Sequence, residues 1–302
     1  MKMLITGDVS DWNLQGFDPG RLTQKGKQLI QSVDCAIYNL EGPIKHPGVP
    51  HEFKLRSNPL TDSLLKLLLR ATGNVQPRVI SSPSMLQLMA LSPQACVTLA
   101  TNHVKDIGKS GLLDTLDCLL HHNIKTVGAE MTASLARRAL PLNDSTVVLN
   151  ANRIASTKMG IPFHIYDATK RDFGAAYFTP AALKREIAIL HETHKHVLLI
   201  LHAGMEMPPS ADRLGINFDA LADLGADLTV IHHPHVYVAT ENEKRNIFVL
   251  GDFIFWRPDC LPPDRPTAAL TLDTSGGQLS VHLERMRVSD IYNYTTTRTP
   301  KT

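Results

Sequence analysis

Short apolar runs of strand length recur along the whole chain and alternate with segments that have helical spacing. The clearest run is Val197 to Leu201, five successive aliphatic residues that end at His202. A run of this kind, bounded by polar residues, is typical of a buried strand. Its alternation with helical segments predicts an α/β protein.

The expected elements follow from this pattern. We expect strands near 2–6, 33–39, 96–100, 124–127, 146–150, 197–202, 228–231 and 246–250, and a terminal hairpin of 267–273 and 278–288. We expect helices near 61–72, 83–91, 110–122, 132–138, 180–193 and 216–224. In 110–122 five leucines recur at three- and four-residue spacing, which predicts one buried face: Leu112, Leu113, Leu116, Leu119 and Leu120.

Five of the expected strands end in residues of the types that serve as metal ligands. These residues are Asp8, Asn39 with Glu41, Asn102 with His103, His202 with nearby Glu206, and the cluster His232, His233 and His235. In open α/β sheets, ligand sites gather beyond the carboxyl ends of the strands. The mixture of oxygen and nitrogen donors suits Mn²⁺, Zn²⁺ or Fe²⁺. The sequence therefore predicts a metal site at this edge of the sheet.

Each of these residues also has an ordinary structural explanation. Asp8 after Gly7 suits a turn or a helix cap, Glu41 suits a solvated loop, and His103 suits a satisfied interior histidine. His202 is harder to explain in this way, because a polar group at the mouth of so apolar a strand needs a partner. Five such coincidences in one chain favour the functional interpretation.

The histidine cluster has the most informative spacing. A strand points alternate side chains the same way, so His233 and His235 are expected to converge on one ion. Pro234 between them fixes a backbone angle and removes a donor, which stiffens the pair.

Composition excludes several classes of protein. The formal charge of +2 on 302 residues gives no support for nucleic-acid binding. The four cysteines are scattered, so no disulfide framework is expected and a reducing compartment fits better. The apolar run at the N-terminus is far too short for a signal peptide, and no run approaches the length of a membrane span. We expect a cytoplasmic protein without a membrane anchor.

The order of the motifs resembles the capsule-biosynthesis CapA (PgsA-like) family of the calcineurin-like metallophosphoesterase superfamily. The resemblance extends from about residue 3 to 256 and rests on Gly7-Asp8-Val9, Asn39-Leu40-Glu41-Gly42-Pro43-Ile44, Asn102-His103 with Asp106 and Gly108, His202-x-Gly204-x-Glu206, Gly225-Ala226-Asp227, His232-His233-Pro234-His235-Val236 and Leu250-Gly251-x-Phe253-Ile254-Phe255. It implies a four-layered α/β/β/α metallophosphoesterase-like sandwich. We expect one such domain over 1–292 and a polar C-terminal tail at 293–302.

The resemblance also implies roles for individual residues. The implied metal ligands are Asp8, Glu41, Asn102, His202, His233 and His235. Glu41 takes the place of the carboxylate that bridges two metals. His103 takes the place of the histidine that assists the leaving group, and Asp106 would orient it. The implied cofactor is a divalent cation, one or two ions, with Mn²⁺ ranked ahead of Zn²⁺, Fe²⁺ and Mg²⁺.

The chain departs from the superfamily pattern at two ligand motifs. The opening Asp-x-His motif reads Asp8-Val9-Ser10, so one histidine ligand is missing and a tightly bound second metal is in doubt. The usual Gly-Asn-Phe reads Gly251-Asp252-Phe253.

Substrate contacts are expected from the loop after Glu41 and from residues beside the ligands. Lys54 and Arg56 alternate, so they share a face if that segment is extended, and they suit a phosphate or carboxylate. A solvated basic loop is the alternative. Glu206 could support His202 or bind a substrate amine, and Asn39 and His232 complete the expected substrate-binding set.

Three functions fit these residues. The first is a metal-dependent hydrolase that acts on a phosphorylated or polyanionic small molecule or capsule precursor. The second is a non-catalytic or weakly catalytic accessory protein for poly-γ-glutamate or capsular polymer synthesis. The third is an iron-dependent redox enzyme, which the Asn-His pair favours less than hydrolysis. We expect no nucleic-acid partner, and the first two functions imply a small-molecule or oligomeric anionic partner.

Overall fold

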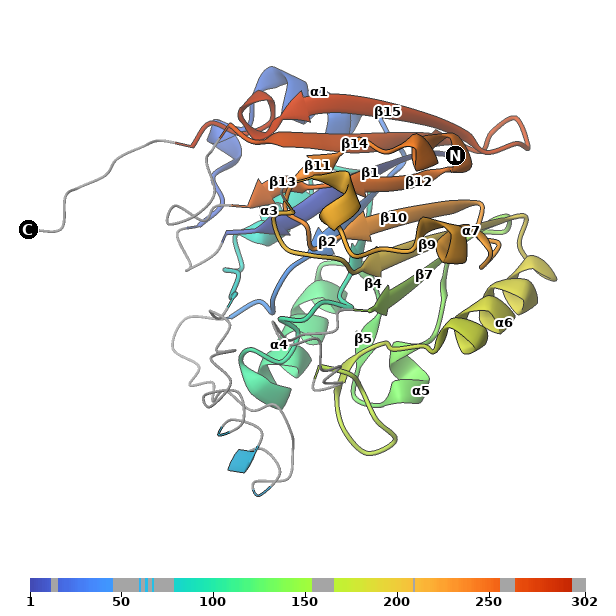
Figure 1. Cartoon of the computed structure of the whole chain (residues 1–302). Coiled ribbons are helices and arrows are strands. Elements are labelled where there is room, and N and C mark those ends of the chain that lie inside the picture. The colour runs from blue at the N-terminus through green and yellow to red at the C-terminus, as the bar shows by residue number, and fades with distance from the viewer. Residues whose placement is uncertain are drawn as a thin grey trace, which may run out of the picture.

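Two β-sheets pack face to face, with helices on their outer sides, in a computed structural model of the chain (Figure 1). The structure describes residues 1–11, 16–45, 60, 63–64, 67, 79–153, 166–208, 210–255 and 264–294. This arrangement confirms the α/β class and the expected order of helix, sheet, sheet and helix layers.

The first sheet contains seven of the described strands. Its order is β15-β14-β1-β2-β3-β4, and β13 also pairs with β1. The bounds are β1 Lys2–Ser10, β2 Cys35–Leu40, β3 Gln94–Thr98, β4 Lys125–Val127, β13 Asp252–Phe255, β14 Pro266–Asp273 and β15 Ser280–Arg287. Strands β1 to β4 and β13 are parallel, while the hairpin β14–β15 adds antiparallel to β1.

The second sheet contains six described strands in the order β11-β12-β10-β9-β7-β6. Its bounds are β6 Leu140–Asn143, β7 Thr146–Asn152, β9 His196–His202, β10 Leu228–His232, β11 Tyr237–Val238 and β12 Ile247–Leu250. The central strands β7, β9, β10 and β12 are parallel. A separate ribbon pairs β5 Ala129–Glu130 with β8 Gly174–Ala175.

Helices cover the outer face of each sheet (Figure 1). Their bounds are α1 Gln24–Gln31, α3 Met85–Met89, α4 Gly108–His121, α5 Ala133–Ala136, α6 Pro180–His191 and α7 Phe218–Ala222, with short 3₁₀ turns at Pro19–Arg21, Ala211–Arg213, Glu241–Arg245 and Val288–Asp290. Helix α4 packs against β4 and helix α6 against β9. Thr179 caps α6 by accepting from the Ala182 amide, and a proline follows at the first helical position.

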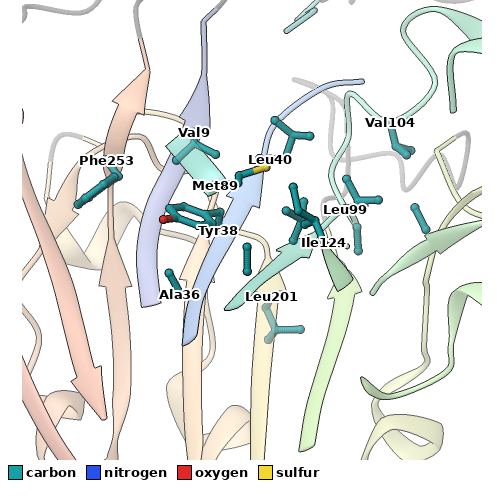
Figure 2. Packing of buried hydrophobic residues seen from close by; sticks show 14 of the residues in the cluster. Val9, Ala36, Tyr38, Leu40, Met89, Leu99, Val104, Ile124, Leu201 and Phe253 are labelled. Atoms are coloured by element: carbon teal, nitrogen blue, oxygen red, sulfur yellow. The ribbon is translucent and has the colours of Figure 1, made fainter. Parts of the chain in front are cut away.

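Buried side chains alternate between two apolar layers along each central strand. Ile37, Leu198 and Ile200 belong to the layer between the sheets. Ala36, Tyr38 and Leu201 belong to the larger core under the helices (Figure 2). Because both faces are covered, the central strands read as continuous apolar runs.

Most expected elements appear within a few residues of their expected positions. Most of the helix expected at 61–72 and most of the loop expected after Glu41 lie outside the described residues. The short strands β5, β6, β8, β11 and β13 and the helix α1 were not expected. The expected leucine face of α4 is partly wrong, because Leu113 and Leu120 are exposed. Each lies one position, about 100° around the helix, from a buried leucine.

Three cysteines of the described chain, Cys35, Cys96 and Cys118, are free and buried, as expected of small apolar residues. Within the described ranges, no helix is both long enough and apolar enough to cross a membrane.

Candidate metal centre

The carboxyl ends of the parallel strands in both sheets meet at one place, and the ligand-type side chains lie there. Strands β1 and β2 bring Asp8 and Glu41, while β9 and the turn after β10 bring His202, His233 and His235. All five side chains are buried. Residues far apart in sequence therefore form one compact polar cluster inside an apolar protein.

Asp8 is fixed by close packing of β1 on β13. A side chain at Gly7 would lie 2.2 Å from the Gly251 carbonyl oxygen, so this approach requires glycine. The Asp8 amide donates to that same oxygen at 2.9 Å. The ladder shifts register between Asp8 and Val9, which is the signature of a bulge that aims a side chain.

The Asp8 carboxylate accepts hydrogen bonds from several donors. Asn39 Nδ2 donates to Oδ1 at 2.6 Å, and the His233 amide donates to Oδ2 at 3.2 Å. His232 Nδ1 lies 3.1 Å from Oδ1. Burial alone would raise the Asp8 pKa, but His232, His235 and His202 outweigh it and hold the pKa below its usual value. Asp8 is therefore an anion.

Glu41 has the opposite environment. Its side chain is 0% exposed, and neither carboxylate oxygen accepts a hydrogen bond from any residue that the structure describes. The nearest ring nitrogens are His235 Nε2 at 3.5 Å, His103 Nε2 at 3.7 Å and His202 Nε2 at 3.8 Å. Burial raises the pKa of Glu41 to about 8. A buried carboxylate without donors is costly unless a cation binds it.

His233 and His235 converge for a reason other than the one expected. Strand β10 ends at His232, so strand alternation does not orient them. Instead both residues adopt left-handed backbone angles, with φ of 94° and 60°, on either side of Pro234. Such angles are uncommon for residues other than glycine and store strain. The turn points both rings at Glu41, and ligand atoms of the three residues lie within 4.8 Å of one another.

The histidines differ in charge. Burial and the neighbouring His235 lower the pKa of His233 to about 3, and burial and His233 hold the His202 pKa well below its usual value. Both rings are neutral, which is the state that binds metals. Burial would lower the His235 pKa as well, but Glu41 and Asp252 outweigh it and raise that pKa to about 10.

His103 and Asp106 form a pair at the rim of the cluster. His103 Nδ1 lies 2.7 Å from Asp106 Oδ2, which also accepts from the Val79 amide at 2.7 Å. The other ring nitrogen faces Glu41 at 3.7 Å. Burial would lower the His103 pKa, but Asp106 and Glu41 raise it above its usual value. Asn102 Oδ1 lies 2.8 Å from His202 Nε2, which joins this rim to the cluster.

Two residues of the cluster were not expected from the sequence, Asp252 and Arg265. Asp252 lies opposite Asp8 in the pairing of β13 with β1. Its Oδ1 lies 2.8 Å from His235 Nδ1, and its Oδ2 accepts from Arg265 Nε at 2.7 Å. The aspartate in place of the usual asparagine was a signal for Asp252, but the sequence carried none for Arg265.

The remaining expected residues fall into three groups. Asn39 and His232 are buried against Asp8, and Thr98 orients the Asn39 amide by donating to its Oδ1 at 2.8 Å. Glu206 is exposed on the loop after β9. Lys54 and Arg56 lie outside the described residues. The substrate roles of these five residues stay predictions.

The donor set fits a divalent cation. Glu41 offers two oxygens, and His202 and His233 each offer an Nδ1 that has no hydrogen-bond partner among the described residues. Carboxylate and imidazole donors suit first-row divalent metals. The protein can thus hold a cation at Glu41, with His233 and His235 as neighbours.

Comparison with known proteins gives a family match over most of the chain. Residues 3–257 match the profile of a family described as bacterial capsule synthesis protein PGA_cap. The chain is 30% identical over 166 residues to the PGA biosynthesis protein CapA of Bacillus subtilis (strain 168) and 29% identical over 168 residues to the capsule biosynthesis protein CapA of Bacillus anthracis. These matches cover 52% and 53% of this chain but only 41% and 39% of the relatives. The matched region thus spans less than half of either relative.

A solved structure supports the fold. The chain resembles a Staphylococcus aureus protein provisionally named a 5′-nucleotidase and crystallised with α-ketoglutarate, with a TM-score of 0.50 and 12% identity. The match covers 98% of this chain and 55% of that one. At this identity the likeness shows a metallophosphoesterase-like fold and nothing about substrate.

Proposed function

We propose that this chain, which belongs to the bacterial capsule synthesis PGA_cap family, is a metal-dependent hydrolase of the calcineurin-like phosphoesterase type. Its substrate would be a phosphorylated or polyanionic small molecule or a capsule precursor. The observation that carries the proposal is the buried Glu41 carboxylate, which has no donor among the described residues and faces three ring nitrogens.

A divalent cation would have Glu41, His233 and His235 as its nearest donors, with Asn102 and His202 beside them. Asp8, also expected as a ligand, accepts hydrogen bonds through both carboxylate oxygens. Such a cation, with Mn²⁺ as the first choice, would polarise a phosphoryl oxygen and lower the pKa of a bound water. His202 and His233 support this because their lowered pKa values keep them neutral, so they need not lose a proton to bind.

His103 would supply the proton for the leaving group. Asp106 fixes its ring through Nδ1, and this leaves Nε2 directed toward Glu41 and the centre of the cluster. The raised pKa of His103 suits a group that must carry a proton near neutral pH. Asn39 and His232 would keep Asp8 in place during the reaction, since both contact its Oδ1.

An anionic substrate is favoured by the basic residues of the loop after Glu41. Lys54 and Arg56 would bind phosphate or carboxylate oxygens there. Glu206, exposed on the loop after β9, would bind an amine on the substrate or support His202.

The test is hydrolysis of p-nitrophenyl phosphate and bis-p-nitrophenyl phosphate by chelator-treated protein reconstituted with Mn²⁺. We expect metal-dependent turnover, loss of bound metal in His233→Ala, and retained metal with reduced turnover in His103→Gln. An exposed histidine provides the matched control, His121→Gln. Unchanged metal content and unchanged hydrolysis in His233→Ala would contradict the proposal.

The second candidate is an accessory role in polymer synthesis, which the names of the two Bacillus relatives favour. The discriminating measurement is binding of poly-γ-glutamate in the presence of a chelator. Tight binding without metal, together with no hydrolysis after reconstitution, would favour the accessory role over the hydrolase.

A further inference from the structure

Two groups of residues around His235 have ligand atoms close enough to hold a cation. One group is Glu41, His233 and His235, and the other is Asp8, His235 and Asp252. In each group the ligand atoms lie within 4.8 Å of one another. We call the space within the Glu41 group the first cation position and the space within the Asp252 group the second. The two groups share His235, so the partners of its two ring nitrogens decide which position is open.

The second position is already filled by hydrogen-bond donors of the protein. Asp252 Oδ2 accepts from Arg265 Nε at 2.7 Å and pairs with Arg265 Nη2 at 2.5 Å, and its Oδ1 lies 2.8 Å from His235 Nδ1. Asp8 Oδ1 accepts from Asn39, and Asp8 Oδ2 accepts from the His233 amide. All four carboxylate oxygens of this group therefore have donors. Arg265 is 2% exposed and keeps its charge at any ordinary pH, so it stays there.

The first position has the opposite property. Neither Glu41 oxygen accepts a hydrogen bond from the described chain, and the same is true of His233 Nδ1. A histidine must be neutral to bind a metal, and in neutral His235 the Nδ1 proton is held by Asp252, so the Nε2 lone pair faces Glu41 Oε2, 3.5 Å away. The Asp252 hydrogen bond thus prepares His235 for the first position while it closes the second.

Charge balance points the same way. With Glu41 ionised and His235 neutral, the states in which they bind a metal, Arg265 offsets one of the three negative charges of Asp8, Glu41 and Asp252. A single divalent cation offsets the remaining two. A second divalent cation would leave two uncompensated positive charges among buried side chains, which is strongly unfavourable.

We infer that this chain holds one divalent cation, at Glu41, His233 and His235, and that the Asp252–Arg265 ion pair takes the place of a second ion. The inference rests on the metal-dependent function proposed above. It makes Asp252 a positioning residue that acts through His235 rather than a metal ligand.

The test is the stoichiometry of Mn²⁺, measured on the full chain after chelation by calorimetric titration and by elemental analysis of desalted protein. We expect one equivalent in the wild type, one in Asp252→Asn and none in Glu41→Gln. Electron paramagnetic resonance of the loaded wild type should show the hyperfine pattern of an isolated Mn²⁺ ion. Circular dichroism checks that both variants are folded, and the wild-type result stands without them.

Two equivalents in the wild type, with the spectrum of an exchange-coupled pair, would overturn the inference and leave the proposed hydrolase intact. Loss of the equivalent in folded Asp252→Asn would also overturn it, because Asp252 would then be a ligand. No bound Mn²⁺ in the wild type would refute both the inference and the proposed function, so the two failures are distinguishable.

Discussion

Glu41→Gln should stabilise the metal-free protein while it abolishes metal binding. Burial raises the pKa of Glu41 from 4.5 to about 8, so the folded protein binds this proton more tightly than the unfolded chain does. The stability that Glu41 contributes is therefore full below about pH 4.5 and is lost as the pH rises through about 8. Glutamine has nearly the same shape and cannot ionise, so it removes this dependence.

The magnitude follows from the same shift. A change from 4.5 to about 8 corresponds to about 5 kcal/mol between the protonated and ionised limits. The buried amide of the variant lacks some hydrogen bonds, which costs about 1–3 kcal/mol. We therefore expect the variant to be about 2–4 kcal/mol more stable than the wild type at pH 8 in chelator, and no more stable at pH 4.5.

The assay is urea unfolding at both pH values in chelator, with the exposed Glu192→Gln as the matched control. Saturating Mn²⁺ should reverse the order, because ligand at about a thousand times its Kd adds about 4 kcal/mol to the wild type alone. If Glu41→Gln were as stable as the wild type or less stable at pH 8 in chelator, the assignment of Glu41 as an unpartnered buried carboxylate would be wrong.

Three other experiments test the rest of the site. Metal binding at pH 7 should release protons, because the pKa values of Glu41 and His235 are raised to about 8 and about 10. The affinity for Mn²⁺ should therefore rise with pH, and the apparent binding enthalpy should depend on the ionisation enthalpy of the buffer. Equal enthalpies in two buffers would contradict this. Asp106→Asn should lower kcat by about 10²-fold and shift the basic limb of its pH profile downward, because the raised pKa of His103 depends on Asp106; an unshifted profile would remove that role. Arg265→Met should lower the free energy of unfolding by about 3–5 kcal/mol, because it leaves Asp252 Oδ2 buried without its arginine partner. Additional Asp252→Asn should recover part of that loss, and an additive double mutant would mean that the pair is not coupled.

The fold class and the strand ends that carry the ligand-type residues could be predicted from the sequence, because both follow from local patterns. Runs such as Val197 to Leu201 identify central strands, and parallel strands deliver their carboxyl ends to one edge. Once Asp8, Glu41 and His202 are assigned to strand ends, their meeting follows from topology alone.

The pairing of distant strands and the backbone angles of the histidine turn could not be predicted from local sequence patterns. The pairing of β13 with β1 brings Asp252 opposite Asp8 across more than two hundred residues of chain, and no local pattern encodes it. Arg265 reaches Asp252 only because of that pairing. The left-handed angles of His233 and His235 are a tertiary outcome, since histidine alone does not favour them.

A bound cation would account for both the strained backbone of the histidine turn and the burial of the Glu41 carboxylate. Residues such as His233 and His235 in left-handed conformations cost about 1–3 kcal/mol each and persist only where surrounding structure holds them. The His233 amide bonds to Asp8, and His235 bonds to Asp252, so the same contacts that aim the rings also maintain the strained backbone. The metal-free protein therefore carries, at one place, both the backbone strain and a buried carboxylate that no described residue hydrogen-bonds. A bound cation would relieve the cost of the buried carboxylate and would use the ring orientation that the strained backbone provides, so the stability of this centre would depend on its ligand.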